Sequence, residues 1–383
     1  MPSDAISHAR SAGARLLELQ DPHVIDVVLA TLVVNQLAGD PVWLVLVAPP
    51  SNGKTEILTA ASAAPTTYML STLTRHTFIS GHRPTAECAE PSLLPQLTDK
   101  TLILKDFTTL LTLNPNDRME ILGLLREIYD GRVTKTFGTG KAFHWEGTMG
   151  LLAGVTPMFD MHSVVHTQLG ERFLLWRIHS GWEIREAQCL RAARAAGNEK
   201  TLRAEFGQAM LGAYTTALEW VQGREVVLGL PLEKWLSALS HLVCAGRTHI
   251  FRDGYSRRVM YVPESEGPGR LFKQLRQLLV GLLALHQRTV PTVGDLRVLR
   301  TVAWDSMHPI KAMAFDALGQ NPDGLGVREF ARVTNLPKTT AQRHLDDLLL
   351  THHATQDDDE NYRPHTKILA FMHTSKEYLN QTL

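Results

Sequence analysis

The chain has 383 residues, of which 44% are hydrophobic and 20% are charged. This balance is typical of globular proteins and excludes a chain that is disordered throughout. Because domains usually contain about 100–200 residues, the length predicts two or three of them. Basic and acidic residues both number 39, so the molecule has no net charge with which to attract a polyanion over long distances. Any nucleic-acid contact must therefore come from local groups of charges.

Cysteine spacing and the lengths of the apolar runs exclude further classes of protein. The cysteines, Cys88, Cys189 and Cys244, are far apart, and no Cys/His spacing typical of zinc occurs. We therefore expect neither a disulfide framework nor a zinc site, and a reducing cytoplasm fits best. No run approaches the roughly 18 apolar residues of a membrane span, and residues 1–15 lack the pattern of a signal peptide. We expect a cytoplasmic protein that does not bind a membrane.

Four segments of the chain differ in their predicted structure. Residues 1–40 have a helical apolar periodicity. In residues 41–182, apolar runs alternate with helical patterns, which predicts an α/β domain with a mostly parallel sheet. Long helical patterns dominate residues 183–305, and residues 306–383 are expected to form a further compact unit. The apolar runs expected to form strands are 42–47, 101–105, 149–155 and 173–178.

The first of these runs leads directly into a phosphate-binding pattern, as in a P-loop NTPase. Ala48 to Thr55 matches Gly-x-x-x-x-Gly-Lys-Ser/Thr, except that alanine replaces the first glycine. In this pattern, main-chain N–H groups hold the phosphates of ATP, the lysine reaches the outer phosphates, and the hydroxyl binds Mg²⁺. The alternative is a chance Gly-Lys-Thr at a turn between a strand and a helix. The residues expected to bind ATP are Ala48, Pro49, Pro50, Ser51, Asn52, Gly53, Lys54, Thr55 and Glu56.

An acidic residue that could bind the metal follows the apolar run 101–105. Asp106 ends this run, and with Thr55 it is expected to hold Mg²⁺; the alternative is that it only caps a strand. Many ATPases of this kind have a glutamate next, which activates water, but here Phe107 follows. The base would have to be another acid, such as Glu127 or Asp130, or hydrolysis would be slow.

The later motifs resemble, in order, those of AAA+ ATPases, and most closely those of the MCM-like helicases. Residues 125–136 contain a helical pattern, a turn and a polar strand, and Gly138-Thr139-Gly140-Lys141 supplies a second turn before Trp145. This resembles the β-hairpin before sensor 1 in that clade, which projects into the pore of a ring and grips DNA. The resemblance implies that Lys135 and Lys141 contact phosphates. A plain surface hairpin is the alternative.

The resemblance implies roles for three further residues. Residues 150–157 resemble the sensor 1 strand, in which Thr156 would position the attacking water. Residues 169–173 resemble the motif that carries an arginine finger, so Arg172 would reach the nucleotide of a neighbouring subunit; the alternative is a salt-bridged surface arginine. Residues 261–271 resemble the entry to a helical lid, where Arg270 would act as sensor 2. Its competitors for that role are Arg247, Arg257 and Arg258.

The resemblance covers roughly residues 20–305 and has clear departures. The first loop glycine and the acid after Asp106 are absent. We also expect no large N-terminal DNA-binding domain. A short AAA+ core with a C-terminal module is more similar to the helicase-like ATPases of phages and mobile elements than to a cellular replicative MCM.

Residues 309–373 are predicted to form a winged helix. Helical patterns at 310–318, 327–333 and 338–350 are followed by residues 351–370, which are expected to form a β-wing. Residues 310–383 contain eight basic and ten acidic residues, and this balance is unfavourable for binding phosphates. The sequence therefore leaves open whether this unit contacts DNA or protein. The polar residues expected to face DNA on the third helix are Lys338, Thr339, Gln342 and Arg343.

Together these patterns predict an ATP-dependent DNA helicase or translocase of the AAA+ class. A finger acting between subunits implies a homo-oligomeric ring, expected to be a hexamer, with single-stranded DNA in its pore. Two alternatives stay open. One is a nucleotide-gated DNA-binding initiator or transposition helper that does not translocate, and the other is a scaffold that binds ATP without hydrolysing it.

Overall fold

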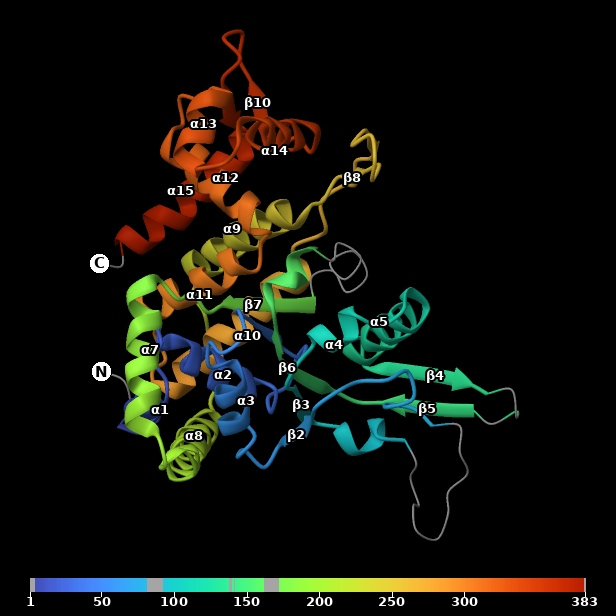
Figure 1. Cartoon of the computed structure of the whole chain (residues 1–383), viewed down its shortest axis with the longest axis vertical. Helices are drawn as coiled ribbons and strands as arrows, with labels where there is room; N and C mark the ends of the chain where they lie inside the picture. The colour runs from blue at the N-terminus through green and yellow to red at the C-terminus, as the bar shows by residue number, and fades with distance from the viewer. Residues whose placement is uncertain (1–3, 81–91, 138–139, 141, 162–171, 382–383) are drawn as a thin grey trace. The chain divides into compact units, whose positions relative to one another are not determined.

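The computed structural model describes residues 4–80, 92–137, 140, 142–161 and 172–381. Its contacts divide the chain into two compact units (Figure 1). Unit 1 comprises Met1–Val227 and Arg276–Pro291, and unit 2 comprises Leu228–Leu275 and Thr292–Leu383. Helix α10 (Gly269–Leu285) therefore begins in unit 2 and ends in unit 1.

Unit 1 is built on a five-stranded sheet in the order β2-β3-β6-β1-β7, with every neighbouring pair parallel. Parallel sheets are covered on both faces, which explains why β1, β3, β6 and β7 are almost continuous apolar runs. The predicted mixed α/β class with a parallel sheet is confirmed. The strands are β1 (Trp43–Val47), β2 (Thr67–Leu70), β3 (Lys100–Leu104), β6 (Met149–Val155) and β7 (Phe173–Arg177).

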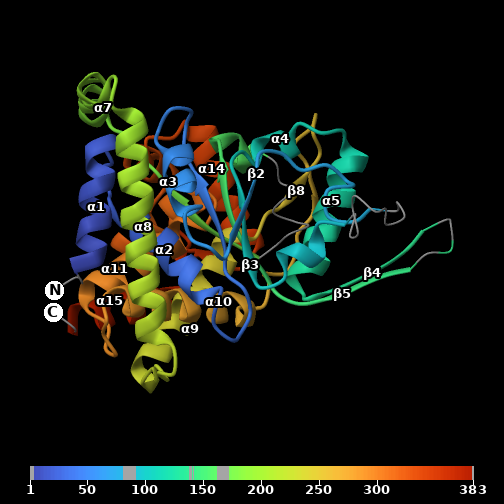
Figure 2. The ribbon, with the colours of Figure 1, turned by 90° about the horizontal axis from the view of Figure 1, so that it is seen from below.

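Helices cover both faces of this sheet (Figure 2). Local sequence signals begin several of them: Asn114 accepts a hydrogen bond from the Asp117 N–H at 3.0 Å, with Pro115 at the first helical position of α5. The helices of unit 1 are α1 (Asp4–Leu16), α2 (His23–Val34), α3 (Lys54–Ala61), α4 (Thr108–Leu111), α5 (Pro115–Tyr129), α7 (Trp182–Ala195) and α8 (Glu199–Val221), with short 3₁₀ helices η1 (Leu94–Leu97) and η2 (Pro157–Met161).

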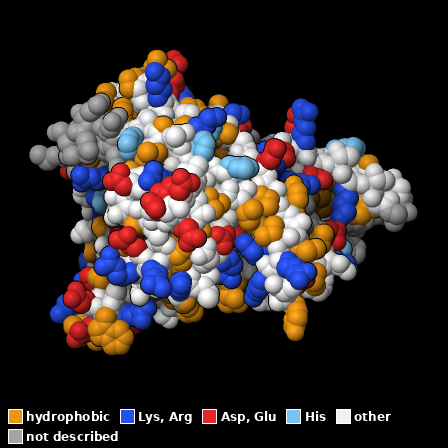
Figure 3. Space-filling view, turned by 90° about the horizontal axis from the view of Figure 1, so that it is seen from above, with side chains coloured by type: hydrophobic (Ala, Val, Ile, Leu, Met, Phe, Trp, Pro, Cys, Tyr) orange, Lys and Arg blue, Asp and Glu red, His pale blue; other side chains and the backbone are white. Residues whose placement is uncertain are grey.

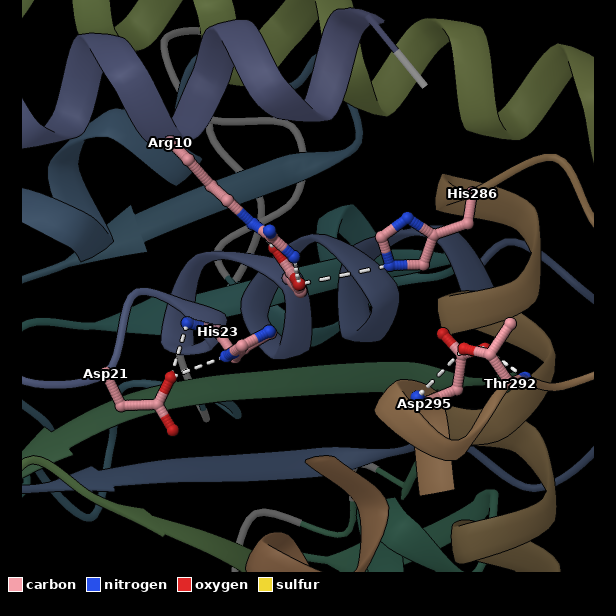
Figure 4. Close-up of polar contacts among 7 residues, drawn as sticks. Arg10, Asp21, His23, His286, Thr292 and Asp295 are labelled. Carbon is pink, nitrogen blue, oxygen red and sulfur yellow. Dashed lines mark hydrogen bonds and ion pairs between the residues drawn. The ribbon is translucent and has the colours of Figure 1, made fainter. Parts of the chain in front are cut away.

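A buried ion pair fastens α1 to α2 (Figure 4). Asp26 in α2 is fully buried, and both of its carboxylate oxygens accept hydrogen bonds from Arg10 of α1, one from Nε at 2.8 Å and one from Nη2. His286, which follows α10, lies with Nε2 4.0 Å from the same carboxylate. A buried carboxylate is tolerated only with such partners, so this contact fixes the position of the N-terminal helix.

A separate hairpin, β4 (Arg132–Thr136) paired with β5 (Ala142–Glu146), extends away from the sheet of unit 1 (Figure 2). Val133, Phe143 and Trp145 point into the core of the unit. The other face is polar and exposed, and Arg132 Nη2 forms an ion pair with Glu146 Oε1 at 3.1 Å. The alternation of apolar and polar residues therefore orients the hairpin.

Unit 2 consists of helices and two small hairpins. In its C-terminal part, α13 ends at Asn335, whose φ of 52° is left-handed, and α14 begins three residues later. A bridge between Leu325 and Tyr362 adds a third strand segment to the last hairpin. The elements are α9 (Leu230–Arg247), β8 (Phe251–Arg252), β9 (Val259–Tyr261), the first part of α10, α11 (Val293–Asp305), α12 (Pro309–Gln320), α13 (Val327–Thr334), α14 (Lys338–Leu350), β10 (Ala354–Gln356), β11 (Tyr362–Pro364) and α15 (Thr366–Gln381).

Within the described ranges, no helix combines the length and the apolar character needed to cross a lipid bilayer.

Candidate functional site

The predicted phosphate loop lies between the carboxyl end of β1 and the first turn of α3. Ser51 (φ 65°) and Gly53 (φ 81°) take the left-handed conformation in this loop. The left-handed φ of Gly53 favours glycine there, and a Cβ atom would also lie 3.2 Å from Leu17 Cδ2, so the leucine side chain would have to shift slightly. Ala48 still pairs with the sheet, since its N–H donates to Val155 O at 3.1 Å. The sharp turn therefore falls after Ala48, which explains why this position does not need a glycine.

Lys54 lies over the loop that precedes it. Its Nζ donates hydrogen bonds to the carbonyl oxygens of Ala48 at 2.5 Å and Pro49 at 2.8 Å. Burial lowers the pKa of this lysine, and the negative charge of Asp106 partly opposes that shift. The structure thus brings Lys54 close enough to Asp106 for their charges to interact, although the two residues come from different strand ends.

Gly154 in β6 allows this close approach and was not among the predicted site residues. A Cβ atom there would lie 2.9 Å from Lys105 O, 3.1 Å from Leu58 Cδ1 and 3.7 Å from Lys54 Cβ. Any side chain would push apart the helix that carries Lys54 and the strand that carries Asp106. A glycine inside an apolar strand pattern is the sequence signal that could have identified it.

Asp106 and Thr156 are joined by a residue that the sequence did not single out. Asp106 Oδ1 accepts a hydrogen bond from the Thr108 N–H at 2.8 Å. Thr108 Oγ1 in turn accepts from the Thr156 N–H at 3.1 Å and lies 3.5 Å from Thr156 Oγ1. Because β6 lies between β1 and β3, the carboxyl ends of all three strands meet at one edge. Lys54, Asp106 and Thr156 therefore lie at the same sheet edge.

The position after Asp106 belongs to the core. Phe107 is fully buried, and its ring packs against Phe159 (centroids 6.4 Å apart) and Phe173 (5.7 Å). Of the two other acids considered as a base, Glu127 is exposed in the last turn of α5, and Asp130 follows that helix. Asp130 is bonded to Arg172, so its carboxylate already has a partner.

Arg172 lies at the opposite edge of the sheet from the phosphate loop. It precedes β7, whose first residue, Phe173, is in register with Trp43 at the amino end of β1. Its Nη2 donates to the two oxygens of Asp130 at 2.9 and 2.8 Å, and its guanidinium lies 5.4 Å from the ring centroid of Tyr129. The residue is only 6% exposed. An ion pair is present, as one reading of the sequence allowed, but its arginine is buried, whereas the side chain of Asp130 is 49% exposed.

A different arginine lies at the same edge as the loop. Arg177 ends β7 in register with Val47, the last residue of β1. Its Nη1 and Nη2 donate to the two oxygens of Asp160 in η2, each at 2.8 Å, and both side chains are largely buried. Sequence reasoning missed this pair, because the two residues come from different motifs. An arginine that ends an apolar run was the available signal.

Thr55 and Glu56, the last two residues of the predicted nucleotide set, face different surroundings. Thr55 is exposed in the first turn of α3. Glu56 accepts hydrogen bonds from Arg203 of α8 at 2.8 to 3.1 Å, which holds its carboxylate against another helix. Among the residues that the structure describes, no cluster of three or more His, Cys, Asp or Glu is arranged to hold a metal ion. Thr55 and Asp106 would suit Mg²⁺ only with nucleotide phosphates and water completing its oxygen ligands.

The predicted DNA-contacting residues differ in exposure and in whether other side chains already hold them. Lys135 lies on the inward face of its hairpin, where Nζ pairs with Glu120 Oε1 at 3.0 Å, whereas Lys141 lies outside the described residues. On α14, Lys338 and Thr339 are exposed and Arg343 is partly buried. Gln342 Nε2 donates to Asp346 at 2.8 Å and to Tyr362 Oη at 2.7 Å, so it is held within unit 2.

Arg270 and the surface charges complete the set. Arg270 lies partly buried in the first turn of α10, in the unit that does not contain the phosphate loop. On the face shown in Figure 3, basic and acidic side chains are interspersed, as expected for a molecule without net charge.

Neither a protein-family model nor a curated protein matches the sequence.

Proposed function

We propose that this chain is an ATP-dependent DNA motor of the AAA+ class, similar to the MCM-like helicases, which hydrolyses ATP between the subunits of a hexameric ring. One observation carries the proposal: a phosphate-loop lysine, an acid that follows β3 and a threonine that follows β6 lie at one sheet edge. The charge of Asp106 acts on Lys54, and Thr108 links Asp106 to Thr156. Ligands of parallel α/β sheets bind outside the carboxyl ends of the strands, which is this edge.

Each residue of this edge has a role in that activity. The N–H groups that begin α3 would bind the phosphates, helped by the positive end of the helix dipole. Lys54 Nζ would exchange its carbonyl partners for phosphate oxygens. Thr55 and Asp106 would hold Mg²⁺, which neutralises charge on the transferred phosphoryl group. Thr156, held by Thr108, would orient the attacking water.

The ring part of the proposal requires Arg172 to act on the nucleotide of a neighbouring subunit. Its position at the far edge of its own sheet suits such a role, because it cannot serve the site of its own subunit without a large movement. In that case assembly of the ring would draw the guanidinium away from Asp130.

We further propose that residues 306–383 form a winged helix that contacts DNA through α14, while the β4–β5 hairpin lines the pore. The succession α12, α13, α14, β10 and β11 supports this assignment. The exposed residues Lys338 and Thr339 are then the first contacts with DNA. Lys135 would have to leave Glu120 before it could bind a phosphate.

A second function is favoured by the buried position of Phe107. In many such ATPases a glutamate at this position activates water, but here the position holds a phenylalanine that belongs to the core. A protein without that base would turn over slowly and could act as a nucleotide-gated DNA-binding initiator that does not translocate. A strand-displacement assay separates the two functions, since only the motor would unwind a forked duplex.

The primary test is ATPase activity with and without single-stranded DNA, for the wild type and for Lys54→Ala and Arg172→Ala. Lys200→Ala and Arg185→Ala, at exposed positions, are the matched controls. We expect DNA to stimulate the wild type and both controls and neither site variant. Wild-type protein that binds no nucleotide would refute the proposal, and binding without turnover would leave the gated binder or a non-hydrolysing scaffold.

Mixing the two inactive variants tests whether the finger acts between subunits. Lys54→Ala subunits keep Arg172, and Arg172→Ala subunits keep an intact phosphate loop. If the arginine acts in trans, mixed rings regain part of the activity that each variant lacks alone. A mixture as inactive as its components, in which mass measurements show mixed oligomers, would contradict the trans role.

A further inference from the structure

The hairpin formed by β8 and β9 in unit 2 carries an unusual set of exposed side chains. It projects from the unit as a narrow loop (yellow in Figure 1). Tyr255 at its tip is 99% exposed, and Met260 and Tyr261 on β9 are 71% and 61% exposed. Large apolar side chains gathered this way on a surface mark a site of interaction.

Positive charge accompanies these rings. Residues 251–261 contain three arginines and one aspartate. Arg257 and Arg258 are exposed beside Tyr255, and no ion pair to another described residue involves them. The carboxylate of Asp253 is occupied, because its Oδ1 accepts hydrogen bonds from the N–H groups of Tyr255 and Ser256. The tip therefore carries two exposed arginines within three positions of an exposed aromatic residue in the sequence.

Hydrogen bonds hold the tip in one conformation. Asp253 N–H donates to Arg258 O at 2.9 Å, and Arg257 N–H donates back to Asp253 O at 3.0 Å. Arg257 itself has a left-handed φ of 58°, which reverses the chain direction. The aromatic ring and the two arginines are thus presented by an ordered turn, which reduces the entropy lost when a ligand binds.

The base of the hairpin is fastened to α14. Arg252 Nη2 donates to Asp347 Oδ1 of that helix, and Arg252 Nη1 donates to Arg257 O at 3.0 Å. One arginine thus joins the helix to the turn. The hairpin and α14 belong to the same unit, so a ligand that binds one is held close to the other.

We propose that the β8–β9 hairpin is a binding site for single-stranded DNA, with Tyr255 stacking on a base and Arg257 and Arg258 contacting phosphates. Unpaired bases stack on exposed aromatic rings whatever their sequence, and neighbouring arginines neutralise the backbone. The two unpaired positive charges favour a polyanion over an apolar protein surface. The choice of DNA rests on the proposed function, but the binding itself needs neither ATP hydrolysis nor the phosphate loop.

The test measures the affinity of the full chain for a fluorescein-labelled oligothymidylate by anisotropy, without nucleotide. We expect Tyr255→Ala to weaken binding about 5- to 150-fold, which corresponds to the loss of one stacked base. Tyr255→Phe keeps the ring and should bind like the wild type. Arg257→Ala combined with Arg258→Ala should lower the slope of log affinity against log salt by about 1.4, at roughly 0.7 per lost phosphate contact.

Matched control variants carry the same kinds of substitution on α7. Trp182→Ala removes another exposed aromatic ring, and Arg185→Ala with Arg194→Ala removes two exposed charges from α7. Hairpin variants that bind no more weakly than these controls would overturn the proposal, as would a Tyr255→Phe variant as weak as Tyr255→Ala. A Lys54→Ala protein should bind the oligonucleotide normally. Failure of the ATPase test therefore leaves the hairpin result interpretable.

Discussion

Unit 1 contains a partly buried lysine and unit 2 a buried one, and the two lysines are held in different ways. Lys54 in unit 1 donates to two loop carbonyls, and the charge of Asp106 lies near. Lys311 on α12 of unit 2 is 6% exposed, and no hydrogen-bond acceptor in the described structure meets its Nζ. Burial lowers the pKa of both residues, that of Lys311 to about 8, where the negative charge of Asp347 opposes the shift.

Under the proposed function, the difference separates a lysine that binds a ligand from one that only costs stability. A buried amine with acceptors of its own can exchange them for phosphate oxygens without being left unpaired. A buried amine without acceptors has lost water and gained only a distant carboxylate. The same substitution, lysine to methionine, should therefore affect mainly activity at Lys54 and mainly stability at Lys311.

The largest effect is expected for Lys54→Met. We expect ATPase activity to fall at least about 100-fold, because a charged group that stabilises the transition state is lost. The melting temperature of unit 1 should change little, since the methionine keeps most of the apolar stem. Steady-state turnover and a thermal melt of the same sample measure both quantities. A variant that loses activity only because it unfolds would contradict this assignment.

Lys311→Met should instead stabilise unit 2, by about 1–3 kcal/mol at pH 7, because an unpaired buried charge is replaced by an apolar side chain. In the wild type, the unfolded state binds more protons than the folded state between pH 8 and the normal lysine pKa near 10.5, so stability should rise over that range. The variant should lack this rise. Chemical denaturation across pH 7 to 10.5 measures it, and a destabilised variant at pH 7 would show that the amine has a partner.

Acid should destabilise unit 2 through two buried histidines. Burial lowers the pKa values of His344 and His353 to about 4 each. Stability should therefore fall as the pH drops from 6.5 toward 4, since only the unfolded state takes up these protons. His344→Leu should remove about 1 kcal/mol or more of this loss. His373→Gln, at an exposed position, is the control. If both variants lose the same stability on acidification, protonation of His344 does not contribute to that loss.

The smallest effect is expected at Thr108, which joins Asp106 to Thr156. Thr108→Val keeps the shape and removes the hydroxyl that accepts the Thr156 N–H. One lost hydrogen bond of about 1 kcal/mol corresponds to a roughly fivefold decrease in turnover. Thr108→Ser should retain most of the activity. A Thr108→Val enzyme with unchanged kcat would mean that Thr156 is positioned by other contacts.

Several features of the candidate site could be predicted because they are local. The apolar run at 42–47 forms β1, and the Gly53-Lys54 step that follows forms the turn and the first residue of α3. Asp106 and Thr156 each follow an apolar run, and a parallel sheet places such strand ends at one edge. The prediction of a metal or nucleotide at that edge itself stays a prediction.

Other features depend on partners far away in the sequence. The motif around Arg172 does not indicate its ion-pair partner, Asp130, which lies 42 positions earlier. The inward position of Lys135 follows from the register of β4 with β5 and from Glu120 of α5. Thr108 became visible as a link only once β3 and β6 were adjacent. No local pattern contains these pairings.

By itself the sequence determined the parallel α/β character of unit 1, the phosphate-loop pattern and the positions of the helices near the C-terminus. Backbone periodicity and turn residues act over a few positions, so they can be read from the chain directly. Tertiary structure alone decided which charges are buried, which lysine has acceptors, and that the β8–β9 hairpin exposes Tyr255 beside Arg257 and Arg258. These outcomes depend on desolvation and on pairing between distant segments, and both are set only when the core has formed.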